Sequence, residues 1–103
     1  MIAVSEVEMR IVLEIVKKHS PGCDVLVFGS RLKGTYSDAS DLDLALKGQV
    51  KLDLDVIGRI KEDFMESDIP YKVDVLDYNR VSTNFQKIID AGYEFIYKKD
   101  EFL

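Results

Sequence analysis

The hydrophobic periodicity of this chain of 103 residues switches repeatedly between a helical and a strand-like pattern. Apolar residues recur at helical spacing in residues 7–16 and 52–65, and short apolar runs typical of strands occupy 24–28, 41–46 and 71–76. Helices and strands that alternate in this way predict an α/β layer structure in which helices flank a small sheet, and they disfavour a helical bundle or a β-sandwich.

Local sequence signals predict where these elements begin and end. Ser5 followed by Glu8 is a capping-box pattern that starts the first helix. Gly34 is placed as the C-terminal stop of one or two helical turns after the first strand. Ser82 is expected to cap a last helix, which Gly92 ends. The boundaries therefore agree with the periodicity.

The stretch 93–97 is aromatic and alternates only weakly. Both an edge strand and an arm that docks on another chain are compatible with it. On an acidic protein these aromatic side chains are more typical of core or dimer contacts than of a surface that stacks bases. We expect an interface there, with a homo- or hetero-oligomer as its outcome.

The composition is that of one folded domain, which we assign to residues 1–103. Hydrophobic residues make up 47% and charged residues 32%, and a chain of this size is expected to bury a single core. The net charge of −5 argues against strong binding to nucleic acid, because phosphate backbones are held mainly by clustered lysine and arginine.

Compartment signals indicate a cytoplasmic protein. The single cysteine, Cys23, has no partner in the chain for a disulfide, and the first residues lack the cationic start and apolar run of a secretion signal. No run of 18 apolar residues is present, so no membrane association through a spanning helix is expected.

Three aspartates lie on predicted strands in positions that should bring them together. Asp41 and Asp43 are two residues apart, so both project from one strand face while the leucines between and after them project from the other. Asp74 lies between Val73 and Val75, which are expected to face the core with those leucines. The sequence therefore predicts that three carboxylates converge.

A cluster of carboxylates calls for a divalent cation, because unpaired like charges at short range repel one another. Oxygen ligands select magnesium or manganese over zinc, and two such ions can clamp the attacking and leaving oxygens of a phosphoryl transfer. A merely solvated strand face is the competing interpretation. A calcium loop starting at Asp38 is excluded, because Asp43 takes the place of its glycine and Gln49 that of its glutamate.

The residues after the first strand are suited to a triphosphate. Gly29 allows the backbone to approach a ligand closely, and Ser30 adds a backbone N–H and a hydroxyl. Arg31 and Lys33 bring positive charge nearby. A Gly-Ser pair alone is an ordinary turn, so its distance from the aspartates carries the argument.

The run from Phe28 to Gly34, the segment Ser40-Asp41-Leu42-Asp43-Leu44 and the strand aspartate Asp74 together resemble the DNA polymerase beta nucleotidyltransferase superfamily. The length and the segment 67–77 look most like the minimal nucleotidyltransferases, or MNT proteins, found as antitoxins beside HEPN toxins. The resemblance covers essentially the whole chain.

This resemblance implies a mixed sheet flanked by helices and a site of six residues. Gly29 and Ser30 would hold the triphosphate of ATP, with Arg31 facing the phosphates. Asp41 and Asp43 would ligate two Mg²⁺ ions, for which Mn²⁺ is the alternative. Asp74 would complete the metal site and help remove the proton of the attacking hydroxyl.

The resemblance also implies a reaction and a partner. AMP would be transferred from Mg-ATP to a hydroxyl of a HEPN-family toxin, with pyrophosphate leaving. A non-catalytic antitoxin that binds nucleotide and neutralises its partner by contact alone is the main alternative. Transfer to RNA or a small molecule is disfavoured by the acidic charge and by the lack of an acceptor-binding domain.

The other polar residues that attract attention have simpler interpretations. His19 follows two lysines at a helix C-terminus, where positive charge is favoured, so we expect a structural role. Asp53 and Asp55 flank the start of a helix, and Asp38 and Asp77 are expected to be loop carboxylates rather than ligands.

Overall fold

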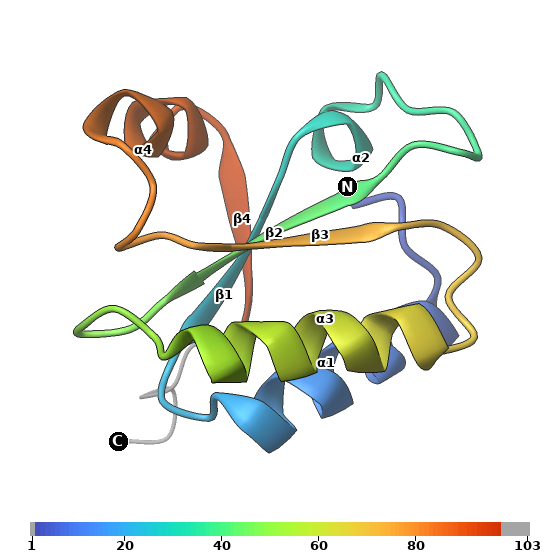
Figure 1. Cartoon of the computed structure of the whole chain (residues 1–103). Coiled ribbons are helices and arrows are strands. Elements are labelled where there is room, and N and C mark those ends of the chain that lie inside the picture. The colour runs from blue at the N-terminus through green and yellow to red at the C-terminus, as the bar shows by residue number, and fades with distance from the viewer. Residues whose placement is uncertain (1, 98–103) are drawn as a thin grey trace.

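The computed structural model describes residues 2–97, in which helices and strands alternate as the sequence predicts (Figure 1). The helices are α1 (Glu6–His19), α2 (Ser30–Lys33), α3 (Leu54–Glu66) and α4 (Thr83–Asp90). The strands are β1 (Asp24–Phe28), β2 (Leu42–Lys47), β3 (Val73–Asp77) and β4 (Tyr93–Tyr97). The predicted α/β class is confirmed.

The strands form one mixed sheet in the order β3-β2-β1-β4. β1 pairs antiparallel with both β2 and β4, whereas β2 and β3 are parallel and are joined through α3. β4 is therefore an edge strand within the described chain, as one of the two interpretations of residues 93–97 predicts, and a contact with another chain stays a prediction. The other edge of the sheet is β3.

Each face of the sheet carries its own hydrophobic cluster. α1 and α3 lie side by side on one face, whereas α2 and α4 lie on the other (Figure 1). The cluster under α1 and α3 contains the alternate residues of β2, namely Leu42, Leu44 and Leu46. The cluster under α4 is smaller and contains Leu26, Phe28, Ala45 and Ile89. The even-numbered positions of β2 thus face the larger core, as predicted.

Three of the helix ends predicted from the sequence are present, whereas α4 ends at Asp90 with Ala91 as its C-cap, one residue before Gly92. Ser5 and Glu8 form a complete capping box, with hydrogen bonds of 3.1 and 3.0 Å to each other's backbone N–H groups. Gly34 ends α2 in the left-handed conformation at φ 84°, and the Ser82 hydroxyl accepts from the backbone N–H of Phe85. Local capping therefore fixes both helix starts and the short turn before the loop to β2.

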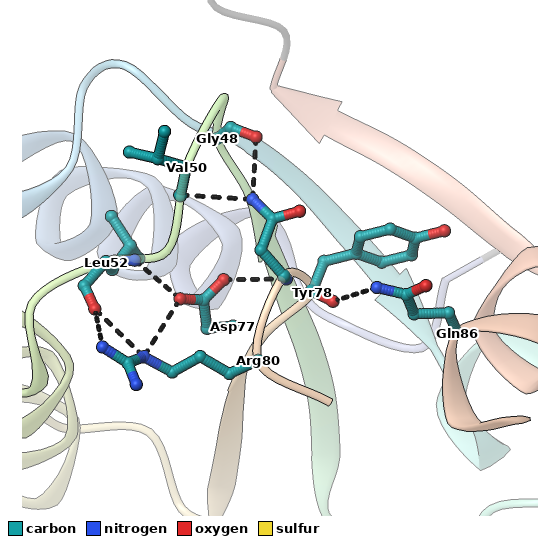
Figure 2. A network of polar contacts seen from close by, with 8 residues as sticks. Gly48, Val50, Leu52, Asp77, Tyr78, Arg80 and Gln86 are labelled. Atoms are coloured by element: carbon teal, nitrogen blue, oxygen red, sulfur yellow. Dashed lines mark hydrogen bonds and ion pairs between the residues drawn. The ribbon is translucent and has the colours of Figure 1, made fainter. Parts of the chain in front are cut away.

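α3 begins two residues later than its periodicity predicts, because a buried carboxylate holds Leu52 outside the helix (Figure 2). The Asp77 carboxylate accepts from the Leu52 N–H at 2.7 Å and from the Asn79 N–H at 2.9 Å. Arg80 donates to the Leu52 carbonyl and pairs with Asp77 at 3.5 Å.

The interpretation of Asp77 as a loop carboxylate was wrong. It is the last residue of β3, only 4% exposed, and it fastens the segment before α3 to the turn after β3. Its role in the described structure is to hold these two segments together.

His19 has the structural role expected of it. Its Nε2 atom lies 2.6 Å from the Asp63 carboxylate, so the pair joins the C-terminal turn of α1 to α3. The described helices include none that is long and apolar enough to cross a membrane.

Candidate active site

The three aspartates lie where β1 ends and where β2 and β3 begin. The register pairs Phe28 with Asp43 across the antiparallel strands, and Asp43 with Asp74 across the parallel ones. Adjacent strands are about 4.8 Å apart, so Asp43 and Asp74 are direct neighbours. Asp41 immediately precedes β2, which begins at Leu42, one residue later than the sequence predicts.

These carboxylates repel one another. The pKa of Asp43 is raised, first because the side chain is partly removed from water, and then by the negative charges of Asp74 and Asp41. Within residues 2–97 no lysine, arginine or histidine forms an ion pair with any of the three. Asp43 therefore senses the charges of both other acids, and no described side chain compensates them with an ion pair; that all three carboxylates converge on one site stays a prediction.

The donor chemistry of this cluster fits a hard divalent cation, but it does not form a closed cage. Among residues 2–97, no three histidine, cysteine or carboxylate side chains are grouped closely enough to enclose a metal ion by themselves. Magnesium is usually held by one or two carboxylates together with water and substrate phosphates, so a pair of aspartates suits it. Metal binding by Asp41, Asp43 and Asp74 stays a prediction.

Gly29 lies directly against the Asp43 carboxylate. Its backbone has φ 83° and ψ −160°, a region that only glycine adopts readily. A Cβ atom added at this position would collide with the Asp43 Oδ2 atom. A glycine is therefore required here on two counts, and the close approach brings the backbone after β1 within reach of the carboxylate cluster.

Ser30 opens α2 immediately beyond Gly29. The short helix contacts β1 and β2, and the Gly29 carbonyl accepts from the backbone N–H groups of Leu32 and Lys33. Ser30 is half-buried, and it is the residue after Gly29, which lies against the Asp43 carboxylate. Its contact with a triphosphate, like that of Gly29, stays a prediction.

Arg31 occupies a place that the sequence did not indicate. It is only 5% exposed, and its guanidinium donates to the carbonyl oxygens of Ala3, Asp38 and Ser40 at 2.9, 3.0 and 2.9 Å. All three guanidinium nitrogens are thus engaged by backbone. A contact with nucleotide phosphates stays a prediction. In the structure the guanidinium instead holds neighbouring backbone segments together.

A groove of about 500 Å³ runs along the β3 edge and meets the carboxylate cluster at Asp74. The groove could not be predicted from the sequence, because the residues that line it separately look like core or helix surface. Its lining comes from α3, the following loop and β3: Lys61, Phe64, Met65, Ile69, Tyr71, Lys72, Val73 and Asp74.

The sequence is similar to known proteins over most of its length. Residues 12–102 match the family model described as "Polymerase beta, Nucleotidyltransferase". A relative from Haemophilus influenzae, named "Probable protein adenylyltransferase MntA", is 42% identical over 94 residues, which cover 91% of this chain and 82% of the relative. The family match includes the segments that carry Gly29, Asp43 and Asp74.

Solved structures share the fold. A crystal structure of a toxin–antitoxin with AMP-PNP superposes with a TM-score of 0.76 at 19% identity, covering 89% of this chain and 74% of that one. A structure of the tri-AMPylated HEPN toxin of Shewanella oneidensis in complex with MNT antitoxin also matches. Its matching chain has a TM-score of 0.69 at 16% identity, and the match covers 89% of this chain and 71% of that one. At these identities the likeness establishes the architecture.

Proposed function

The chain belongs to the polymerase beta nucleotidyltransferase family, and we propose that it transfers AMP from magnesium-bound ATP to a hydroxyl of a partner protein. The observation that carries this proposal is the register of Asp43 beside Asp74, with the Asp43 carboxylate against Gly29. This arrangement places an uncompensated anionic cluster next to backbone that can approach a triphosphate.

In this proposal each group has a separate task. Gly29 and Ser30 hold the triphosphate through backbone N–H groups and the serine hydroxyl. Asp41 and Asp43 hold Mg²⁺, which would neutralise charge on the reacting phosphate and on pyrophosphate. Catalysis then rests mainly on positioning and on the stabilisation of charge.

Asp74 is assigned to the acceptor side of the site. It is the member of the cluster on the edge strand, and it is one of the residues that line the groove along that edge. An acceptor hydroxyl that approaches along the groove would meet Asp74 first. There the carboxylate can ligate a metal or accept the proton of the hydroxyl. The oxygen then attacks the α-phosphate, an AMP ester forms and pyrophosphate leaves.

We assign a HEPN-family toxin as the partner that supplies this hydroxyl. The assignment rests on the relative named as a protein adenylyltransferase and on structural neighbours that are toxin–antitoxin complexes. A cytoplasmic location belongs to the same proposal, since ATP and magnesium are supplied there.

The test is AMP transfer to a HEPN-family toxin as the proposed partner. The purified proteins are incubated with α-phosphate-labelled ATP and magnesium, next to a variant carrying both Asp41→Asn and Asp43→Asn whose folding has been verified by circular dichroism. Only the unmodified chain should label the partner, and chelation of magnesium should abolish the label. Equal labelling by the variant, or none by either protein, contradicts the proposal.

A second candidate is neutralisation of the toxin by contact alone. It is favoured by large apolar side chains exposed on β4 and α4, with Ile88 58%, Tyr93 40% and Phe95 36% exposed. The same double variant separates the two functions. A contact antitoxin would still neutralise its toxin with both aspartates replaced, whereas an adenylyltransferase would not.

A further inference from the structure

The buried guanidinium of Arg31 joins α2 to the N-terminal segment and to the loop between α2 and β2. Its Nη1 donates to Ala3 in the N-terminal segment, and its Nε and Nη2 donate to Ser40 and Asp38 in the loop between α2 and β2. The Arg31 carbonyl in turn accepts from the Ala3 N–H at 2.9 Å. Both ends of the residue are therefore fixed by backbone.

The loop held by Arg31 leads directly to the first aspartate of the cluster. Ser40, whose carbonyl accepts from Nε, immediately precedes Asp41. The loop also has its own closure, since the Ser37 N–H donates to the Ser40 hydroxyl at 2.8 Å. That closure shapes residues 37–40, and the guanidinium supplies the hydrogen bonds between them and α2 in the described part of the chain, and so ties them to Gly29 and Ser30.

The guanidinium also contacts Tyr71, which lies in the segment before β3. Its carbon lies 3.6 Å from the centre of the Tyr71 ring, a distance at which a cation is attracted by the ring face. The Tyr71 hydroxyl donates to Glu8 at 2.9 Å, and Arg31 is one of the groups that lower the pKa of Glu8. Tyr71 lies three residues before Asp74, so this contact reaches the second strand of the cluster.

We propose that Arg31 is a positioning residue that sets the separation of Asp41 from Asp74, and thereby the affinity of the carboxylate cluster for a divalent cation. This inference rests on the metal site of the proposed function. The fork of the guanidinium is essential to it, because one planar group reaches Ser40, Asp38 and the Tyr71 ring together. A lysine ammonium is a point charge that cannot do so.

The decisive experiment measures metal binding without nucleotide. Mn²⁺ is titrated into the protein and the free ion is followed by electron paramagnetic resonance, for the unmodified chain and for Arg31→Lys. Arg31→Lys is expected to weaken Mn²⁺ binding about tenfold or more, the usual range for a group that orients metal ligands. At saturating magnesium, its KM for ATP should be unchanged.

The matched control is Arg80→Lys. Arg80 also donates through Nε and Nη2 to a loop carbonyl, that of Leu52, but it does so at the far end of the sheet beside Asp77 (Figure 2). Both variants lose a structural brace and should melt at lower temperature. Only Arg31→Lys should change the Mn²⁺ affinity, so general destabilisation and positioning are separated.

A second variant protects the test against misfolding of the first. Tyr71→Leu removes the stacked ring and leaves the three guanidinium hydrogen bonds, so it should also weaken Mn²⁺ binding, but less than Arg31→Lys. Unchanged Mn²⁺ affinity in the folded variants overturns the inference. So does a raised KM for ATP with normal Mn²⁺ binding, which would place Arg31 on the nucleotide phosphates instead.

Failure of this inference and failure of the proposed function give different results. If Mn²⁺ binding depends on Asp41, Asp43 and Arg31 but no AMP is transferred, only the proposed reaction is wrong. If AMP is transferred and Arg31→Lys binds Mn²⁺ normally, only the positioning role is wrong.

Discussion

Replacement of Asp43 by asparagine should stabilise the metal-free protein while it removes a ligand of the proposed site. The folded state raises the pKa of Asp43, through partial burial and then through the charges of Asp74 and Asp41. A carboxylate with a raised pKa binds its proton more tightly when folded, so its ionised form opposes folding. Asparagine has nearly the same shape and carries no charge.

The magnitude follows from the position of Asp43 in the sheet. It lies directly beside Asp74 on the neighbouring strand, where like charges destabilise a pair by about 0.2–1 kcal/mol, and its partial burial adds to that. We expect Asp43→Asn to raise the free energy of unfolding by about 1 kcal/mol. For a domain of this size that corresponds to an increase in Tm of roughly 4–8 °C.

The pH dependence has a definite sign. The destabilisation by Asp43 is absent below the pKa of an unfolded aspartate, where both states are protonated, and it develops as pH rises through the raised folded pKa. The advantage of Asp43→Asn should therefore be full at pH 7 and should disappear in acid. Thermal unfolding of both proteins in chelator, followed by circular dichroism at pH 7 and in acid, measures this difference.

Magnesium should reverse the order of stability. A ligand that binds only the folded state at about 100 times its Kd stabilises it by roughly 2.7 kcal/mol, and Asp43→Asn should gain much less than the unmodified chain. Asp68→Asn, at an exposed loop position, is the control and should alter neither result. A lower Tm for Asp43→Asn than for the unmodified chain in chelator at pH 7 would refute the reasoning.

Three further substitutions test the site and its frame. Gly29→Ala should lose transfer activity and about 1–3 kcal/mol of stability, because its φ of 83° is strained for alanine and the new Cβ collides with Asp43; unchanged activity in a transfer assay would count against the site. Asp77→Asn should lower the free energy of unfolding by roughly 1–3 kcal/mol through its buried contacts, yet retain transfer well below its Tm, as a denaturant titration and the same assay show. Asp63→Asn should reduce the loss of stability in acid, because the hydrogen bond with His19 lowers the pKa of Asp63 in the folded state. The stabilisation by ionised Asp63 is present above the unfolded pKa and is lost as pH falls through the folded pKa. Acid titrations that coincide for the two proteins would contradict this.

The sheet and the acidic cluster could be predicted from sequence because both depend on local periodicity. Alternation in β2 puts Leu42 and Leu44 on the core face, which forces Asp43 onto the other, and the same logic places Asp74. Neighbouring strands then bring the two acids together. No distant contact has to be known for this inference.

Arg31 and Asp77 could not be predicted, because their partners are distant in sequence. The guanidinium reaches Ala3, 28 residues away, and the carboxylate reaches Leu52, 25 residues away. Neither contact leaves a periodic signal. In the sequence, the position of Arg31 next to Gly29 and Ser30 favours a contact with phosphates. In the structure the side chain is buried, and it donates to backbone carbonyl oxygens instead.

The open form of the acidic cluster bears on how a metal and a nucleotide would bind. Because no three of the described ligand side chains enclose an ion, a cation bound by a pair of aspartates keeps coordination positions for other oxygens. The phosphates of a nucleotide at Gly29 and Ser30 would fill those positions. Each ligand then strengthens the binding of the other, since coupling between two ligands is reciprocal. In the proposed site, a bound cation would relieve the repulsion around Asp43 that is unfavourable in the metal-free fold, and this relief would favour the binding of Mg-ATP as a unit.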